Sequence, residues 1–173
     1  RKDRIADLSG GMKQRIGIAL TLLHLPRILV VDEPTAGLDP RERIRFRNLL
    51  VELSKNRIVI FSTHIIEDIA SSCNKVAVID KGRVKYNGTP SDMVKIAEGV
   101  SWVFDIPAGE FDKLSKELLI VHHIRDGENV RVRCLSETPP VPYARKATPL
   151  LEDAYLWLIR NIKLSNKEEL ITA

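Results

Sequence analysis

The sequence has 173 residues, of which 44% are hydrophobic and 29% are charged, an ordinary balance for a globular protein of one or two domains. Its 27 Lys and Arg are scattered among 23 Asp and Glu, so the net charge of +4 forms no basic block and we expect no nucleic-acid partner. The longest nearly apolar run, residues 16–23, is shorter than the about 20 residues of a membrane-spanning helix, so we expect a soluble protein.

A helix and a buried strand are predicted at the start of the chain. From Ser9, apolar residues at three- and four-residue spacing predict a helix that ends at Pro26. Its expected buried face consists of Met12, Ile16, Ala19, Leu20 and Leu23. Residues 28–31 are a continuous apolar run, which predicts a strand covered on both faces in a parallel sheet and ending at Asp32 and Glu33.

The same alternation repeats in the next segment. Asp39 and Pro40 form a cap and first-turn pair that predicts a second helix. Residues 58–61 predict a second buried strand, which runs into Ser62-Thr63-His64 and a third helix to about residue 73. The expected inward face of that helix is Ile65, Ile66, Ile69 and Ala70. Strands that alternate with helices place this part of the chain in the α/β class.

The remaining sequence predicts a hairpin and then a second, small α+β domain. Lys81 and Gly82 separate strands at 76–80 and 83–87, with the glycine supplying a positive φ, and a short helix to residue 98 ends a first domain of residues 1–98. The second domain, residues 99–173, begins at a break at Gly99. Its expected elements are strands near 102–106, 118–124 and 130–135, a helix near 111–118, an extended connection over 137–149 and a helix over 150–162.

Three short segments have the residues that phosphate chemistry needs. In residues 8–15, LSGGMKQR, a serine cap and two glycines leave bare backbone N–H groups at a helix start, which favours an anion. Residues 28–40, ILVVDEPTAGLDP, place two carboxylates at the carboxyl end of a strand, where open parallel sheets bind ligands. Asp32 suits Mg²⁺, and Glu33 is a candidate general base. His64 follows the next strand and can bridge a phosphate oxygen and an attacking water.

Each segment also has a structural reading. Ser-Gly-Gly by itself is more often a flexible turn ahead of a helix, and adjacent carboxylates are common in loops. His64 alone would be a capping or surface histidine. The functional interpretation depends on all three segments occurring in one chain and in this order.

Together, residues 8–15, 28–40 and 62–64 resemble the signature motif, the Walker B motif with its D-loop, and the H-loop of ABC transporter nucleotide-binding domains. The resemblance covers about the first half of the chain. It implies a partial RecA-like fold of the P-loop NTPase type, with ATP and Mg²⁺ as cofactors. It also implies that Asp32 helps to hold Mg²⁺, that Glu33 is the catalytic carboxylate and that His64 contacts the γ-phosphate.

The same resemblance implies a dimer with composite ATP sites. Ser9 and Gly11, with Gly10 between them, would contact the γ-phosphate bound to the opposite subunit, and Asp39 would communicate across the interface. Met12 and residues 148–155, TPLLEDAY, are similar to exporter ATPases of the ABC-2 type. We therefore expect an ATPase subunit of an exporter whose partners are a second nucleotide-binding domain and a transmembrane permease, at the inner face of the cell membrane.

One part of the family pattern is missing from the sequence. It contains no Gly-x-x-x-x-Gly-Lys-Ser/Thr loop to cradle the phosphates, and it opens at Arg1 without an initiator methionine. We therefore expect a fragment of a longer protein that by itself neither binds ATP tightly nor hydrolyses it. Two alternatives stay open: an ABC ATPase that acts on ribosomes or DNA, and a non-catalytic dimerisation or regulatory module that uses the residues after Gly99.

Overall fold

The structure, a computed structural model, describes residues 8 and 10–171, apart from the side chains of residues 10, 14, 163 and 165–171. The chain forms two compact units that meet in sequence between Asn74 and Lys75. The boundary expected from the sequence lies later, between residues 98 and 99. The hairpin and short helix that precede residue 98 thus belong by their contacts to the second unit, and the domain assignment itself stays a prediction.

The first unit is built on a parallel pair of strands. Its described elements are α1 (Gly10–Leu22), β1 (Ile28–Asp32), α2 (Pro40–Ser54), β2 (Ile58–Ser62) and α3 (Ile66–Ser72). In the β1–β2 ladder Ile28 lies opposite Ile58 and Asp32 lies opposite Ser62, so the two carboxyl ends are level. The predicted cap of α2 is confirmed, because the Asp39 side chain accepts a hydrogen bond from the backbone N–H of Glu42 at 2.8 Å.

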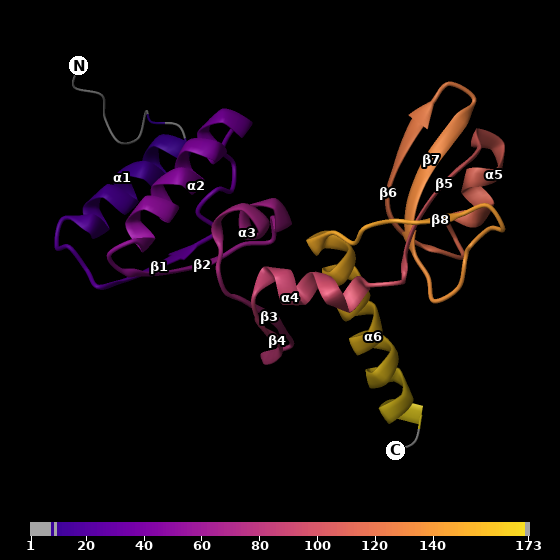
Figure 1. Cartoon of the computed structure of the whole chain (residues 1–173). Helices are drawn as coiled ribbons and strands as arrows, with labels where there is room; N and C mark the ends of the chain where they lie inside the picture. The colour runs from indigo at the N-terminus through magenta and orange to yellow at the C-terminus, as the bar shows by residue number, and fades with distance from the viewer. Residues whose placement is uncertain (1–7, 9, 172–173) are drawn as a thin grey trace. The chain divides into compact units, whose positions relative to one another are not determined.

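The core of the first unit lies between the two longer helices and one face of the strand pair (Figure 1). Side chains of a strand point alternately to its two faces, so every second residue of β1 and β2 can face these helices. The buried residues of this core are Ile18, Leu38, Phe46 and Leu50, and those partly buried against it are Leu22, Val31, Val59 and Phe61.

The prediction that both strands are covered on both faces is wrong for this chain. The apolar residues of the second face are largely exposed: Val30 by 71%, Ile28 by 56%, Ile58 by 58% and Ile60 by 53%. Among the described residues, α1 and α2 pack on the opposite face only. A continuous apolar run therefore indicates that both faces of a strand are suited to burial. It does not show that this chain alone covers both faces.

The expected buried face of α1 is wrong, and that of α3 is wrong only in part, because Ile65, Ile66 and Ile69 are half-buried. Met12, Ile16 and Leu20 of α1, and Leu23 just after it, are exposed by 39–71%, and the buried residue among the described side chains of this helix is Ile18. Apolar residues lie all round α1, so their spacing matches more than one face. On α3, Ala70 is exposed and the fully buried residue is a carboxylate, Asp68.

The second unit contains a hairpin, an antiparallel sheet and a long helix. Its described elements are β3 (Val76–Asp80), β4 (Arg83–Gly88), α4 (Pro90–Val94), the 3₁₀ helix η2 (Lys95–Ala97), β5 (Ser101–Pro107), α5 (Ala108–Leu114), β6 (Leu119–Asp126), β7 (Asn129–Leu135), β8 (Arg145–Lys146) and α6 (Leu151–Ile171). The β3–β4 hairpin is confirmed, and both Lys81 (φ 48°) and Gly82 (φ 72°) are left-handed, as a type I′ turn requires.

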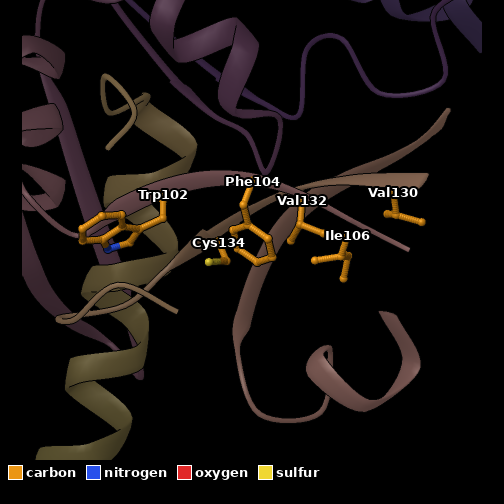
Figure 2. Packing of buried hydrophobic residues seen from close by; sticks show 6 residues of the cluster. All are labelled: Trp102, Phe104, Ile106, Val130, Val132 and Cys134. Atoms are coloured by element: carbon orange, nitrogen blue, oxygen red, sulfur yellow. The ribbon is translucent and has the colours of Figure 1, made fainter. Parts of the chain in front are cut away.

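The four-stranded sheet of this unit has the order β6-β7-β5-β8. The short strand β8 pairs with β5 through Val103 and Trp102 and lies within the segment 137–149, which the sequence predicted as an extended connection. The core on the sheet combines alternate residues of β5 and β7 (Figure 2), namely Trp102, Phe104, Ile106, Val130, Val132 and Cys134.

The long helix α6 contacts α4 and η2 of the same unit. In the part of the chain that the structure describes, no helix is long and apolar enough to cross a membrane.

The two cysteine thiols are expected to react slowly. Burial raises the pKa of the Cys134 thiol to about 11, and burial together with the negative charge of Asp68 raises that of Cys73 to about 11. The thiolate is the reactive form, and with such pKa values only about 10⁻³ of each thiol is ionised at pH 8. Alkylation by iodoacetamide, followed by mass spectrometry, should be slow for both and accelerate as the pH rises or in urea. Rapid labelling of either in the folded protein at pH 8 would contradict this.

Candidate functional site

The site lies at the carboxyl ends of β1 and β2, where the parallel register brings Asp32 opposite Ser62. The Ser62 hydroxyl donates a hydrogen bond to the Asp32 carboxylate. The backbone N–H of Glu33 donates to the carbonyl oxygen of Ser62 at 3.0 Å and lies 3.2 Å from its hydroxyl oxygen. Ser62 therefore ties both adjacent carboxylate residues to the end of β2.

His64 and Glu33 contact each other directly. His64 Nδ1 lies 2.8 Å from Glu33 Oε1. An ionised carboxylate can only accept, so Nδ1 is the donor in this contact. The His64 side chain is 75% exposed and that of Glu33 is 35% exposed, so the pair faces solvent.

The backbone of Glu33 is unusual. Its φ of 44° lies in the left-handed region, which residues other than glycine seldom occupy. Such conformations persist where the surroundings hold them, and they concentrate at functional sites. Here the N–H bond to Ser62 and the side-chain contact with His64 hold Glu33 from two sides.

The residues at the strand ends fit a hard cation such as Mg²⁺. Asp32 offers carboxylate oxygens beside the Ser62 hydroxyl, and oxygen ligands are what Mg²⁺ prefers. Over the described residues no group of three or more His, Cys, Asp and Glu is arranged to hold a metal ion. Mg²⁺ is commonly held by one or two carboxylates, with waters and substrate phosphates as its other ligands, so the two oxygen donors are a sufficient protein contribution.

The segment predicted to contact a nucleotide across a dimer is only partly described. Ser9 lies outside the described residues, and Gly10 begins α1. A Cβ added to Gly11 would lie 2.6 Å from Leu38 Cδ2, so glycine here lets α1 pack against the segment that precedes α2. Asp39 is exposed and caps α2. The nucleotide-contacting roles of Ser9, Gly10, Gly11 and Asp39 stay predictions.

Sequence reasoning missed a buried polar cluster next to this site. The Thr35 hydroxyl donates to Asp68 Oδ2, and Arg47 Nη1 lies 3.4 Å from Asp68 Oδ1. Thr35 and Asp68 are both fully buried. A signal existed, since Asp68 lies three residues after Ile65 and one before Ile69 on what was expected to be an inward helix face, and a carboxylate there needs a partner.

Comparison with known proteins gives consistent results. A family model described as "AAA domain, putative AbiEii toxin, Type IV TA system" matches residues 4–67. The ABC transporter ATP-binding protein YxlF of Bacillus subtilis is 30% identical over 170 residues, which are 90% of this chain and 58% of that protein. Nod factor export ATP-binding protein I of Rhizobium etli is 33% identical over 169 residues, 90% of this chain and 52% of that protein.

A solved structure is also similar. The protein cbiO1 of Clostridium perfringens, part of the ABC transporter complex cbiONQ, is 40% identical and matches with a TM-score of 0.47 over 51% of this chain and 36% of its own. The chain spans only about half the length of the two curated relatives. Those relatives nevertheless match nine-tenths of its residues, so the chain belongs to the family of ABC transporter ATP-binding proteins, as its motifs predicted, and to that family's α/β, RecA-like fold class.

Proposed function

We propose that this chain is the catalytic-side half of an ATP-hydrolysing ABC transporter subunit, in which Glu33 is the general base. The observation that carries the proposal is the contact between Glu33 and His64 at the carboxyl ends of two parallel strands. A base must be held within reach of the proton that it removes, and an exposed carboxylate fixed by an imidazole and by its own backbone meets that need.

The proposed reaction needs one proton acceptor. Glu33 takes a proton from a water molecule as the water oxygen bonds to the γ-phosphorus of ATP. The bond from that phosphorus to the β–γ bridging oxygen breaks, which leaves ADP and phosphate. His64 holds the Glu33 carboxylate through Nδ1, and a proton on Nε2 of its exposed ring would let that nitrogen donate to a γ-phosphate oxygen.

Asp32 and Ser62 are the residues that would hold Mg²⁺. When bound, the ion supplies positive charge that stabilises the phosphate oxygens during transfer. The contribution of this chain is to orient the Asp32 carboxylate, which the Ser62 hydroxyl fixes at the strand end.

The intact protein is proposed to work as a pair of nucleotide-binding domains on a transmembrane permease, at the inner face of the cell membrane. Ser9, Gly10 and Gly11 would then meet the ATP of the opposite subunit, with Asp39 at the interface. The exposed Ile and Val face of β1 and β2 supports a larger intact domain, because parallel strands of this composition are normally covered on both faces. Export is favoured because one relative is named for Nod factor export.

An ATPase assay tests the proposal. The full-length protein should release phosphate from ATP, lose that activity in EDTA and regain it with Mg²⁺. The 173-residue chain alone should show no turnover, because its sequence has no phosphate-cradling loop. A folded full-length protein without Mg²⁺-dependent turnover would refute the function, and clear turnover by the chain alone would refute its dependence on the rest of the subunit.

A further inference from the structure

Asp68 is a carboxylate with no exposed surface on α3, four residues after His64. A buried carboxylate is costly unless charged and hydrogen-bonding partners compensate for its lost hydration. The proposed chemistry of Glu33 and His64 does not use Asp68 directly. The burial of Asp68 therefore needs another explanation, which lies in the segments that its hydrogen bonds connect.

The partners of Asp68 come from two other segments of the first unit. The Thr35 hydroxyl donates to one carboxylate oxygen, and Thr35 lies two residues after Glu33. Arg47 of α2 approaches the other oxygen at 3.4 Å, and its side chain is only 18% exposed. The same Arg47 nitrogen also lies 3.4 Å from the backbone carbonyl of Glu67. One carboxylate thus joins the segment after β1, helix α2 and helix α3.

These bonds join the segment after β1 to the segment after β2 on both sides of the Glu33–His64 pair. On one side, the β1–β2 ladder and the Ser62 hydroxyl tie the two segments at Asp32. On the other side, they are tied again by Thr35 and Asp68. Glu33 and His64 lie between these two ties, and the His64 side chain is largely exposed, so the ties on either side help to fix the pair.

We propose that Asp68 is a positioning residue for the Glu33–His64 pair, acting through its hydrogen bond with Thr35. This inference rests on the proposed ATPase function. Without the Thr35–Asp68 bond, the segment that carries Glu33 loses its hydrogen bond to helix α3, which follows His64. A misplacement of reacting groups by about 1 Å can cost on the order of 100-fold in rate, whereas loose positioning of a base leaves the binding of ATP largely intact.

The test uses the full-length protein, the variant Asp68→Asn and a pair of variants at Thr35. Asp68→Asn and Thr35→Val should each lower kcat by on the order of 10- to 100-fold. KM for ATP should change by less than about twofold. Thr35→Ser keeps the hydroxyl and should stay near the parental rate. Where Asp68→Asn does not fold, the Thr35 pair alone decides: equal kcat values for Thr35→Val and Thr35→Ser overturn the inference.

A matched control exists in the second unit. There the Ser101 hydroxyl donates at 3.1 Å to the fully buried carboxylate of Asp153, so Ser101→Ala removes the same kind of bond in the other unit. It should leave kcat unchanged. In a His64→Ala background, Thr35→Val should lower kcat little further, because the pair to be positioned is gone. An equal loss in both backgrounds would show a structural role only.

Failure of this inference can be told from failure of the proposed function. If the folded full-length protein shows no Mg²⁺-dependent turnover, the function itself is refuted, and if Glu33→Gln turns over at the parental rate, the role of Glu33 as general base is refuted. If Glu33→Gln is inactive while Asp68→Asn and Thr35→Val keep the parental kcat, only the positioning role of Asp68 is overturned.

Discussion

Replacing Glu33 by glutamine in the full-length protein is expected to lower kcat for ATP hydrolysis by about 10²- to 10⁴-fold, the usual contribution of a general base. Glutamine has the same shape, and its amide oxygen can still accept the hydrogen bond from His64 Nδ1. What it loses is the ability to take a proton from water. The loss should therefore fall on kcat, with little change in KM for ATP. Steady-state phosphate release measures both quantities.

The variant should also accumulate in a nucleotide-bound state. If two subunits close around ATP before hydrolysis, Glu33→Gln should retain ATP and elute as a dimer in size-exclusion chromatography. Glu52→Gln is the matched control, because Glu52 lies on α2 with a 67% exposed side chain paired to Lys55. It should hydrolyse ATP at the parental rate. Parental turnover by Glu33→Gln would show that another group removes the proton.

Several elements of the fold were predictable because local signals agreed. The Asp39-Pro40 cap, the two apolar strands and the Lys81-Gly82 turn each have their own chemistry, and each element formed where expected. The closeness of Asp32, Glu33 and His64 also followed from one rule, that adjacent parallel strands end at the same edge of a sheet.

What could not be predicted depends on contacts between distant segments. The inward face of α1 is set by Leu38 and Phe46, and no spacing within α1 identifies them. The buried Asp68 was missed because helix periodicity assigns burial by hydrophobicity, and a carboxylate is buried only if Thr35 and Arg47 arrive from elsewhere. The left-handed backbone of Glu33 has no sequence signal either, since glycine is the usual residue there.

The other large effect is expected on stability, at Asp153 in the second unit. This carboxylate has no exposed surface and accepts hydrogen bonds from the Arg133 guanidinium, at 2.9 Å from Nε, and from the Ser101 hydroxyl. It also caps α6 by accepting from the backbone N–H of Leu150 at 2.8 Å. Arg133 in turn donates to the carbonyl of Thr148 at 2.7 Å, so one ion pair fixes the start of α6 against the sheet. This network gives the sequence pattern over residues 148–155 a structural role.

Asp153→Asn should lower the free energy of unfolding of the second unit by about 3–5 kcal/mol, because it leaves the largely buried Arg133 side chain without its charged partner. The hydrogen bonds of Asp153 raise the pKa of Arg133 above its ordinary value. A raised pKa means that the arginine contribution is complete below the ordinary pKa and is lost only above it, so the effect of the variant should be the same at pH 7 and pH 9.

Urea unfolding of the 173-residue chain, followed by tryptophan fluorescence, measures this effect. The sequence has two tryptophans, Trp102 and Trp157, and both lie in the second unit, so the signal reports on that unit alone. The transition midpoint of Asp153→Asn should fall by more than about 1 M. Asp105→Asn is the matched control, since Asp105 pairs with Arg131 on the same sheet but both side chains are exposed, and its midpoint should stay close to the parental value. Equal midpoints for the two variants would mean that Asp153 does not hold α6 to the sheet.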